Sequence, residues 1–212
     1  MREDIPNKDR IIVTSENFGD LLIQSLEQAV AFKNGDTSKA RIRVRVSKEH
    51  QMELDTALRE QLLHLLRGGN AHLSFDDAVA DFPMDAINTR PPNVPYTPWH
   101  LLEHLRITQW DILDFIRNPH YQEITWPDDY WPAPDAEADA TAWEETLAAF
   151  RADLKAVEAI SSNPQTDLDV AIPHGDGQTI LREILLVADH NAYHIGEFAI
   201  LRQVMGTWGR RN

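Results

Sequence analysis

Two histidines near the C-terminus have the spacing of a metal site. His190 and His194 are four residues apart, and on a helix this spacing places both imidazoles on one face, about 40° apart. Two imidazoles arranged in this way can converge on one divalent cation. The zinc-protease motif is excluded, because that motif has a glutamate after its first histidine and this chain has Asn191 there.

The segment around these histidines is apolar nearly all round, which is typical of a helix at the centre of a bundle. At about 100° per residue, Glu183 and Glu197 share an arc of about 60° with His190 and His194. Buried polar groups need partners, and a metal ion with carboxylates that orient its histidine ligands would provide them. The alternative is two core histidines bonded to carbonyls or carboxylates. Glu197 is the preferred candidate for a catalytic carboxylate, and Glu183 is the second.

A third ligand is expected from the helix predicted after Thr97, which contains His100 and His104. By helical-wheel arithmetic, His104 lies about 100° and His100 about 140° from the centre of the apolar face. His104 is therefore expected at the edge of the core, and His100 further toward solvent as a surface or loop-packing residue. A site built between facing helices favours His104. The predicted metal ligands are His104, His190 and His194.

Five segments have helical periodicity. They are residues 16–33, 49–67, 97–117, 139–160 and 179–205. Thr97 and Pro98 have the residue types of an N-cap and a first-turn proline, and Gly68 is a stop signal after the second segment. The last four segments predict an all-α fold, a four-helix bundle in residues 47–212.

Residues 1–46 differ in character and are predicted to form an N-terminal extension, a helix followed by a strand. The strand signal is the strict alternation of residues 41–46 (RIRVRV). A strand without a partner in a helical bundle has an open edge, which proteins usually cover. We therefore expect residues 41–46 to pair with their twin in a homodimer, with the extension as a dimerisation arm.

The charge is uneven along the chain. Residues 1–46 carry eight Lys or Arg and seven Asp or Glu, whereas residues 47–212 carry 12 and 27. The strongly acidic residues 47–212 would repel phosphate backbones. Nucleic acid is therefore not an expected partner. The chain has no apolar run of about 18 residues, no secretory signal at its start and no cysteine. We expect a cytoplasmic protein that acts on a small molecule and binds no membrane.

Two loops near the predicted helices have open interpretations. The segment 119–138 contains the aromatic residues Tyr121, Trp126, Tyr130 and Trp131, which would either cover a pocket or close the end of the bundle. His174 precedes Gly175 and is expected as a turn residue, with contact to a substrate as the alternative.

Several of these motifs together resemble the DinB-like (DNA-damage-inducible) superfamily. They are WHLLEHL at 99–105, DHNAYHIGE at 189–197, LRGGNAH at 66–72 and IPHGDGQT at 172–179. The resemblance covers about residues 50–208 and implies a frequently dimeric four-helix bundle. It also implies three metal-binding histidines, which correspond to His104, His190 and His194. Some members are thiol S-transferases or isomerases that use low-molecular-weight thiols.

A metal held by three neutral imidazoles leaves a position open for water or substrate. Zinc is the expected ion, with nickel or iron as alternatives. We expect a metal-dependent enzyme, a thiol S-transferase or a hydrolase, acting on a small electrophilic molecule. Any thiol must arrive as a cofactor, since the chain has no cysteine. The alternatives are a non-enzymatic metal-binding stress-response protein and an interaction protein that recruits a partner through its N-terminal arm.

Overall fold

A computed structural model of the chain describes residues 12–13, 17–20, 22–23, 26–27 and 45–208. The chain divides into two compact units, residues 1–58 and 59–212. The division of the sequence after residue 46 stays a prediction. Among the described residues of the predicted helix 16–33, residues 18–20, 22–23 and 26–27 are helical.

The first unit contains a short pair of parallel strands, β1 (Ile12–Val13) and β2 (Arg45–Val46). The predicted strand 41–46 is thus observed in its last two residues, and residues 41–44 lie outside the described part of the chain. β2 has a partner within its own chain, which the sequence pattern did not identify. Its pairing with a second copy stays a prediction.

Helix α2 (Lys48–Arg67) begins in the first unit and continues into the second. In the second unit, Leu62 and Leu66 are buried. Arg59 is also buried there, and its guanidinium caps the end of α5 (Ala140–Ser162) by donating to three carbonyl oxygens at 2.7–3.0 Å. These oxygens belong to Ser161, Asn163 and Thr166. The second half of α2 is therefore fastened to the rest of its unit.

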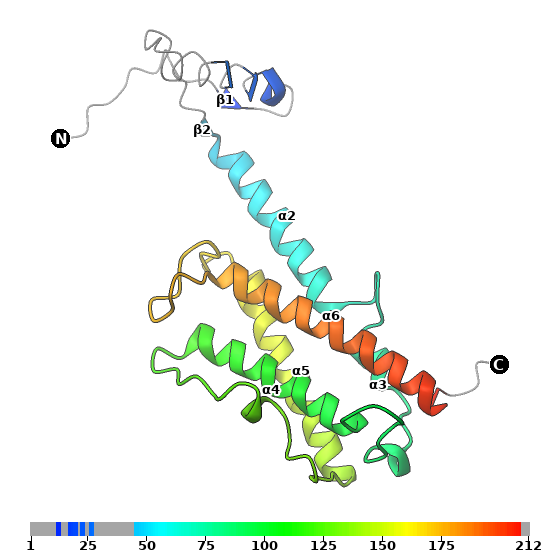
Figure 1. The fold of residues 1–212 in the computed structure, drawn as a ribbon. Coiled ribbons are helices and arrows are strands. Elements are labelled where there is room, and N and C mark those ends of the chain that lie inside the picture. The colour runs from blue at the N-terminus through cyan, green and yellow to red at the C-terminus, as the bar shows by residue number, and fades with distance from the viewer. Residues whose placement is uncertain (1–11, 14–16, 21, 24–25, 28–44, 209–212) are drawn as a thin grey trace. The chain divides into compact units, whose positions relative to one another are not determined.

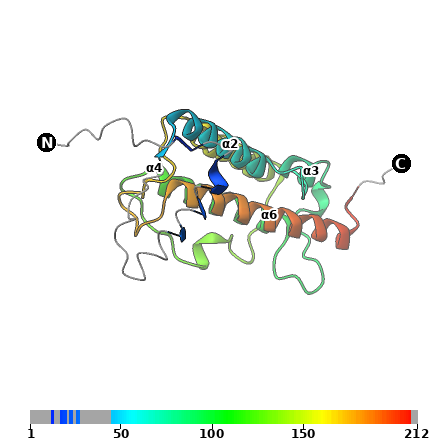
Figure 2. The same ribbon diagram turned by 90° about the horizontal axis from the view of Figure 1, so that it is seen from above.

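Four main helices give the described part of the chain its all-α fold: α2, α4 (Pro98–Arg117), α5 and α6 (Ile180–Met205). Helix α4 packs against both α5 and α6 (Figures 1 and 2). The predicted four-helix architecture is confirmed at this level. No helix among the described residues has the length and apolar character needed to cross a membrane.

The helix boundaries follow from local signals in the sequence. Thr97 caps α4, with its Oγ1 accepting the backbone N–H of His100 at 3.1 Å, and Pro98 occupies the first turn. Gly68 ends α2 at a φ of +65°, a left-handed conformation that favours glycine. Gly206 ends α6 in the same way.

A short helix, α3 (Phe75–Val79), lies between α2 and α4. Ser74 caps it by accepting the backbone N–H of Asp77, the Ser-x-x-Asp pattern of a helix start. Phe75 then stacks on Phe150 of α5, with ring centroids 3.8 Å apart.

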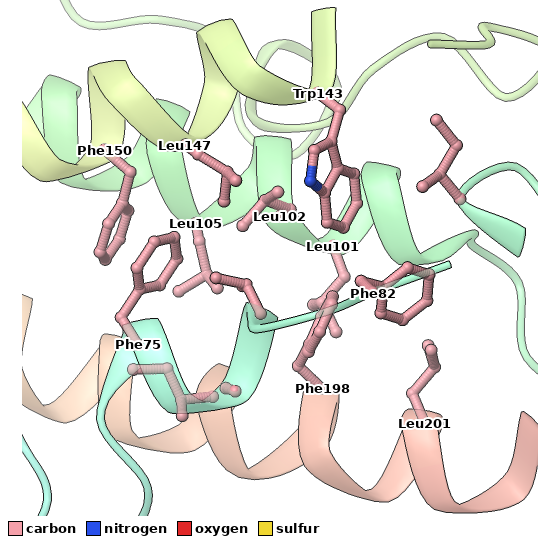
Figure 3. Close-up of a cluster of buried hydrophobic side chains, with 14 of the residues drawn as sticks. Phe75, Phe82, Leu101, Leu102, Leu105, Trp143, Leu147, Phe150, Phe198 and Leu201 are labelled. Carbon is pink, nitrogen blue, oxygen red and sulfur yellow. The ribbon is translucent and has the colours of Figure 1, made fainter. Parts of the chain in front are cut away.

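The main hydrophobic core lies between α3, α4, α5 and α6 (Figure 3). Trp143 and Phe150 of α5 meet Leu101 of α4 and Phe198 of α6 in this core, and all four are essentially inaccessible to solvent. Fully burying a side chain of this size contributes about 1.5–3 kcal/mol. The core therefore fixes α4 and α6, the two helices that carry the predicted ligands.

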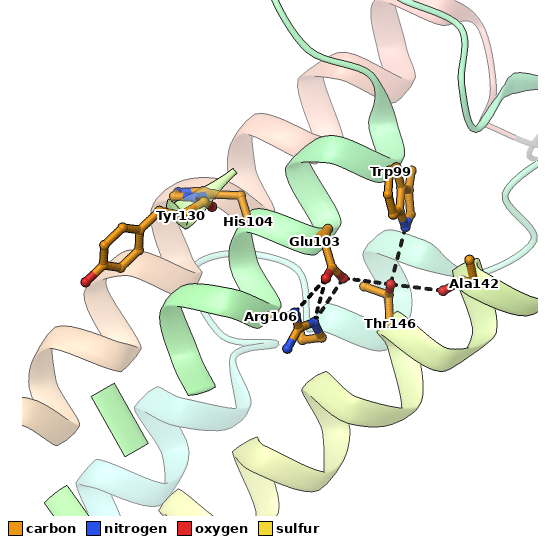
Figure 4. Close-up of polar contacts among 7 residues, drawn as sticks. All are labelled: Trp99, Glu103, His104, Arg106, Tyr130, Ala142 and Thr146. Atoms are coloured by element: carbon orange, nitrogen blue, oxygen red, sulfur yellow. Dashed lines mark hydrogen bonds and ion pairs between the residues drawn. The ribbon is translucent and has the colours of Figure 1, made fainter. Parts of the chain in front are cut away.

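A polar network joins α4 to α5. Glu103 binds Arg106 at 2.6 Å and accepts the Thr146 hydroxyl at 2.8 Å. Figure 4 shows Glu103 directed toward this network, whereas His104 points elsewhere, toward Tyr130. Consecutive residues of α4 thus serve helix packing and the histidine cluster separately.

Candidate metal centre

The three predicted ligands come together in space. His104 on α4 and His190 and His194 on α6 offer ligand atoms that all lie within 4.8 Å of one another. Their ring centroids are 4.5–5.0 Å apart. Among the described residues, this is the single group of three or more His, Asp or Glu side chains with such convergence.

His104 is held in one tautomer by the loop that follows α4. Its Nδ1 lies 2.8 Å from the carbonyl oxygen of Tyr130, so Nδ1 donates and Nε2 keeps its lone pair. The ring of Trp131 covers His104 on one face. His104 was expected at the edge of the core, but its side chain is more deeply buried than that. The residue is 2% exposed, because the 119–138 loop closes over this flank of α4.

His190 meets His104 nitrogen to nitrogen, with 3.2 Å between the two Nε2 atoms. Since Nε2 of His104 is a bare acceptor, His190 must donate through its own Nε2. Its buried Nδ1 then has no hydrogen-bond partner among the described residues. Two nitrogens at this distance can instead hold a cation between them, each through its Nε2 lone pair. Nδ1 of His190 would then carry the proton and would still need an acceptor. A tetrahedral site with Zn–N bonds of about 2.0–2.1 Å sets its ligand nitrogens about 3.3 Å apart, so the spacing of His104 and His190 is that of two ligands of a zinc-sized ion.

His194 is oriented by a carboxylate on the same helix. Its Nδ1 donates to Glu197 Oε2 at 2.6 Å, which leaves Nε2 as the ligand atom. The other oxygen of Glu197 accepts the hydroxyl of Tyr96. A carboxylate behind a histidine ligand fixes the ring and makes it a better donor to a metal. The structure thus places Glu197 beside His194, as its spacing predicted, and brings in Tyr96, which the sequence did not indicate.

Two of the histidines are held neutral by their surroundings. The pKa of His104 is lowered to about 4, chiefly by burial and also by the neighbouring His194, although the bond to the carbonyl oxygen of Tyr130 raises it. Burial lowers the pKa of His190 to about 3, with His194 and His104 acting in the same direction. Both rings are therefore unprotonated at neutral pH, which is the state that binds a metal ion. The donor set fits a divalent metal that accepts imidazole.

His100 is not a surface residue. It is 3% exposed, and its Nε2 donates to the carbonyl oxygen of Ala136 at 2.9 Å. The loop-packing role expected for it is observed, whereas its expected position toward solvent is wrong, because the 119–138 loop buries this flank of α4. His100 does not join the cluster of His104, His190 and His194.

A cavity of about 630 Å³ adjoins the cluster through His190. Its wall combines α4, α6, the aromatic 121–130 segment and the turn at 174–178. Tyr121, Trp126 and Tyr130 line it, so this segment borders a cavity as well as covering the bundle. His174 also lines the cavity, with its Nε2 donating to the carbonyl oxygen of Phe115 at 2.7 Å.

Glu183 lies in the wall of this cavity, two helical turns before His190. It is 2% exposed and binds Arg182 at 2.7 Å. Glu183 and Glu197 therefore occupy different surroundings, one at the cavity and one behind His194. Their catalytic roles stay predictions.

The comparisons with known proteins agree with the motifs. The sequence model of the DinB superfamily matches residues 69–198, a segment that contains all three histidines of the cluster. Comparison with curated proteins and with solved structures gives no significant match. The matched segment covers more than half of the 212 residues, and it confirms the resemblance seen in the histidine motifs. The chain belongs to the DinB superfamily.

Proposed function

We propose that the protein is a metal-dependent enzyme that activates a thiol or a water molecule for attack on a small electrophilic substrate. One observation carries this proposal: His190 belongs both to the three-histidine cluster and to the wall of the 630 Å³ cavity. A cavity of this volume accommodates a small organic molecule. The metal centre and the substrate site would then share a wall.

A divalent ion bound by three neutral imidazoles keeps a position open and favours the deprotonated form of a thiol or water that binds there. The protein supplies the geometry. Tyr130 and Glu197 fix the tautomers of His104 and His194, so that both Nε2 lone pairs face the cluster. Trp131 shields one face of His104 from water. Glu197 acts through His194 and is a positioning residue in this scheme.

The proposed reaction is a substitution or a hydrolysis. A sulfur–carbon or oxygen–carbon bond forms, the bond from that carbon to its leaving group breaks, and the proton of the thiol or water passes to the leaving group or to solvent. The chain has no cysteine, so a thiol nucleophile enters as a low-molecular-weight cofactor. Zinc is the ion proposed, with nickel or iron as the alternatives.

The test combines metal analysis of the purified protein with a panel of small thiols and electrophiles. We expect one divalent ion per chain and turnover that disappears in His194→Ala. The matched control is His120→Ala, an exposed histidine outside the cluster. Stoichiometric metal without turnover above that of the free ion would favour the alternative, a non-enzymatic metal-binding protein. Absence of metal binding would overturn the proposal.

A further inference from the structure

The cavity beside His190 has an unusual balance of charge. Among the described residues its wall contains four carboxylates and one guanidinium, a net charge of −3 with neutral histidines and of −1 once the divalent ion proposed at His190 is included. The carboxylates belong to Asp111, Glu123, Asp176 and Glu183, and the guanidinium belongs to Arg182. We infer that this cavity binds a small organic cation with N–H donors, an amine or a guanidine. The inference rests on the proposed function, because it names the substrate class of the same site.

Asp111 is a buried carboxylate in this wall, and two hydrogen bonds hold it in place. It is 5% exposed, and its two oxygens accept the hydroxyls of Tyr121 at 2.9 Å and Tyr130 at 2.7 Å. Burial and the bond to Asp111 raise the pKa of both tyrosines, so the hydroxyls stay protonated. Each phenol has used its one proton on Asp111 and has only lone pairs left. This trio therefore offers acceptors, which call for a ligand with donors.

Glu183 adds a second buried carboxylate. Its Oε1 binds Arg182, and among the hydrogen bonds of the described residues none involves its Oε2. Arg182 is the only arginine or lysine that the described part of the chain contributes to the cavity wall, and its guanidinium binds Glu183. An anionic ligand would thus meet excess negative charge and compete with Glu183 for Arg182. An ammonium group would meet complementary charge.

Thr108 gives an independent sign of a missing ligand. It lies in the cavity wall and is 8% exposed, and its buried Oγ1 has no hydrogen-bond partner among the described residues. Buried polar atoms are rarely left unpaired, because an unpaired one costs about 1–3 kcal/mol. A polar group of a ligand in the cavity would satisfy this hydroxyl, which can accept from an N–H or donate to an acceptor.

Aromatic side chains in the wall favour the same class of ligand. Phe115, Tyr121, Trp126 and Tyr130 line the cavity. The first two rings meet edge to face with centroids 5.1 Å apart, as do the last two. Aromatic faces attract ammonium and guanidinium groups. Acceptors, negative charge and aromatic rings together select a cation that carries an apolar body.

The experiment compares three probes of similar shape on the full-length protein: 2-phenylethylamine, 2-phenylethanol and 3-phenylpropionate. It is run on the metal-loaded and on the metal-free protein, because an amine or a carboxylate can also bind an open metal position. Isothermal titration calorimetry should show the amine binding at least about tenfold more tightly than the alcohol, with the anion weakest. The affinity for the amine should fall as salt is added. Equal affinity for the three probes, a preference for 3-phenylpropionate, or no binding of the amine would overturn the inference.

Variants locate the effect in the cavity. Asp111→Asn should weaken amine binding at least about tenfold and leave the metal content unchanged. Asp111 is buried, so Asp111→Asn could fail to fold. A second variant at an exposed wall position, Glu123→Gln, keeps the test valid in that case and should weaken amine binding by about two- to fivefold. The matched control is Glu145→Gln, an exposed carboxylate on α5 outside the cavity wall. Weakening by Glu145→Gln equal to that by Glu123→Gln would overturn the assignment to this cavity.

Metal content and amine affinity are measured separately, so the two proposals fail in different ways. Selective amine binding by a protein that takes up no metal would overturn the proposed function and support this inference. Stoichiometric metal without preference for the amine would overturn this inference and leave the metal-dependent function standing.

Discussion

The indole of Trp131 lies parallel to the imidazole of His104, with ring centroids 3.9 Å apart and 2° between the ring planes. Trp131 also stacks on Tyr96, with centroids 5.2 Å apart, and Tyr96 donates to the carboxylate behind His194. One loop residue thus contacts a predicted ligand and a side chain that supports the orientation of another. The geometry of the cluster depends on the 119–138 loop as well as on α4 and α6.

Replacing Trp131 with alanine should weaken metal binding by about tenfold, because His104 loses the ring that holds it in place. Trp131→Phe retains an aromatic face and should lose less. Affinities are measured by competition with a chromophoric chelator. Trp110→Ala is the control, since Trp110 is an exposed indole on α4 outside the histidine cluster and the cavity wall. Equal affinities of Trp131→Ala and the wild type would contradict this prediction.

The histidine cluster itself predicts a clear pattern of losses. His190→Ala and His194→Ala should abolish stoichiometric binding of a divalent ion, and His104→Ala should weaken it severely, because each removes one of three converging nitrogens. His100→Ala should keep the metal, because its Nε2 binds a loop carbonyl instead. Metal analysis after dialysis checks each variant. Undiminished binding in His104→Ala together with loss in His100→Ala would show that the third ligand is His100, one turn earlier on α4.

The helices and the histidine cluster were predictable because their signals are local. Thr97 and Pro98 predicted the start of α4, and the spacing of His190 and His194 predicted two ligands on one face of α6. Choosing His104 over His100 needed only the angle between successive residues of a helix. The burial of His100 was not predictable in this way, because it depends on a loop whose path has no periodicity.

The cavity is the part of the site that sequence patterns missed. Asp111 is 10 residues from Tyr121 and 19 from Tyr130, and no helical or strand period relates them. Their meeting depends on how the loop after α4 folds back. Arg59 shows the same limit, because the carbonyl oxygens that it binds lie at the end of α5 and just beyond it, more than 100 residues away along the chain. A capping pattern at Ser74 was present in the sequence and would have predicted α3.

The tyrosines that bind Asp111 predict an alkaline sensitivity. Burial, followed by the bond to Asp111, raises the pKa of Tyr121 and of Tyr130 above the ordinary value near 10. The folded state therefore keeps these protons after the unfolded state has lost them. Their contribution to stability is complete below about pH 10 and is lost as the pH rises above it.

Urea unfolding at several pH values tests this sensitivity. Tyr121→Phe removes one of the two groups, so its free energy of unfolding should fall less steeply than that of the wild type above about pH 10. The comparison uses the slope with pH, because the loss of a hydrogen bond lowers stability at every pH. Identical slopes in the two proteins would exclude the proposed linkage.

The N-terminal extension predicts a change of oligomeric state. Deleting residues 1–46 removes both β1 and β2, and with them the strand edge expected to pair in a homodimer. Light scattering after size-exclusion chromatography should then show a shift toward the monomer mass, while circular dichroism confirms retained helix. Removal of residues 209–212 is the control. An unchanged mass after deletion of residues 1–46 would end the idea of a dimerisation arm.

The carboxylate behind His194 gives the sharpest test of mechanism. Glu197 accepts from His194 Nδ1 and from the Tyr96 hydroxyl, so Glu197→Gln replaces a charged acceptor with an amide that can accept through one oxygen only. His194 becomes a weaker and less firmly oriented ligand. The variant should keep its metal yet slow metal-dependent turnover by roughly 10- to 100-fold, the range typical of residues that orient a ligand.

Tyr96→Phe separates orientation of His194 from general disturbance of the site. It removes the second donor to Glu197 and leaves the 2.6 Å contact between Glu197 and His194 in place, so its loss of turnover should be smaller than that of Glu197→Gln. Turnover and metal content are measured on the same samples, because a fall in both would mean that the ion has left. Wild-type turnover in Glu197→Gln would show that His194 needs no carboxylate partner, and Glu197 would lose its place in the mechanism.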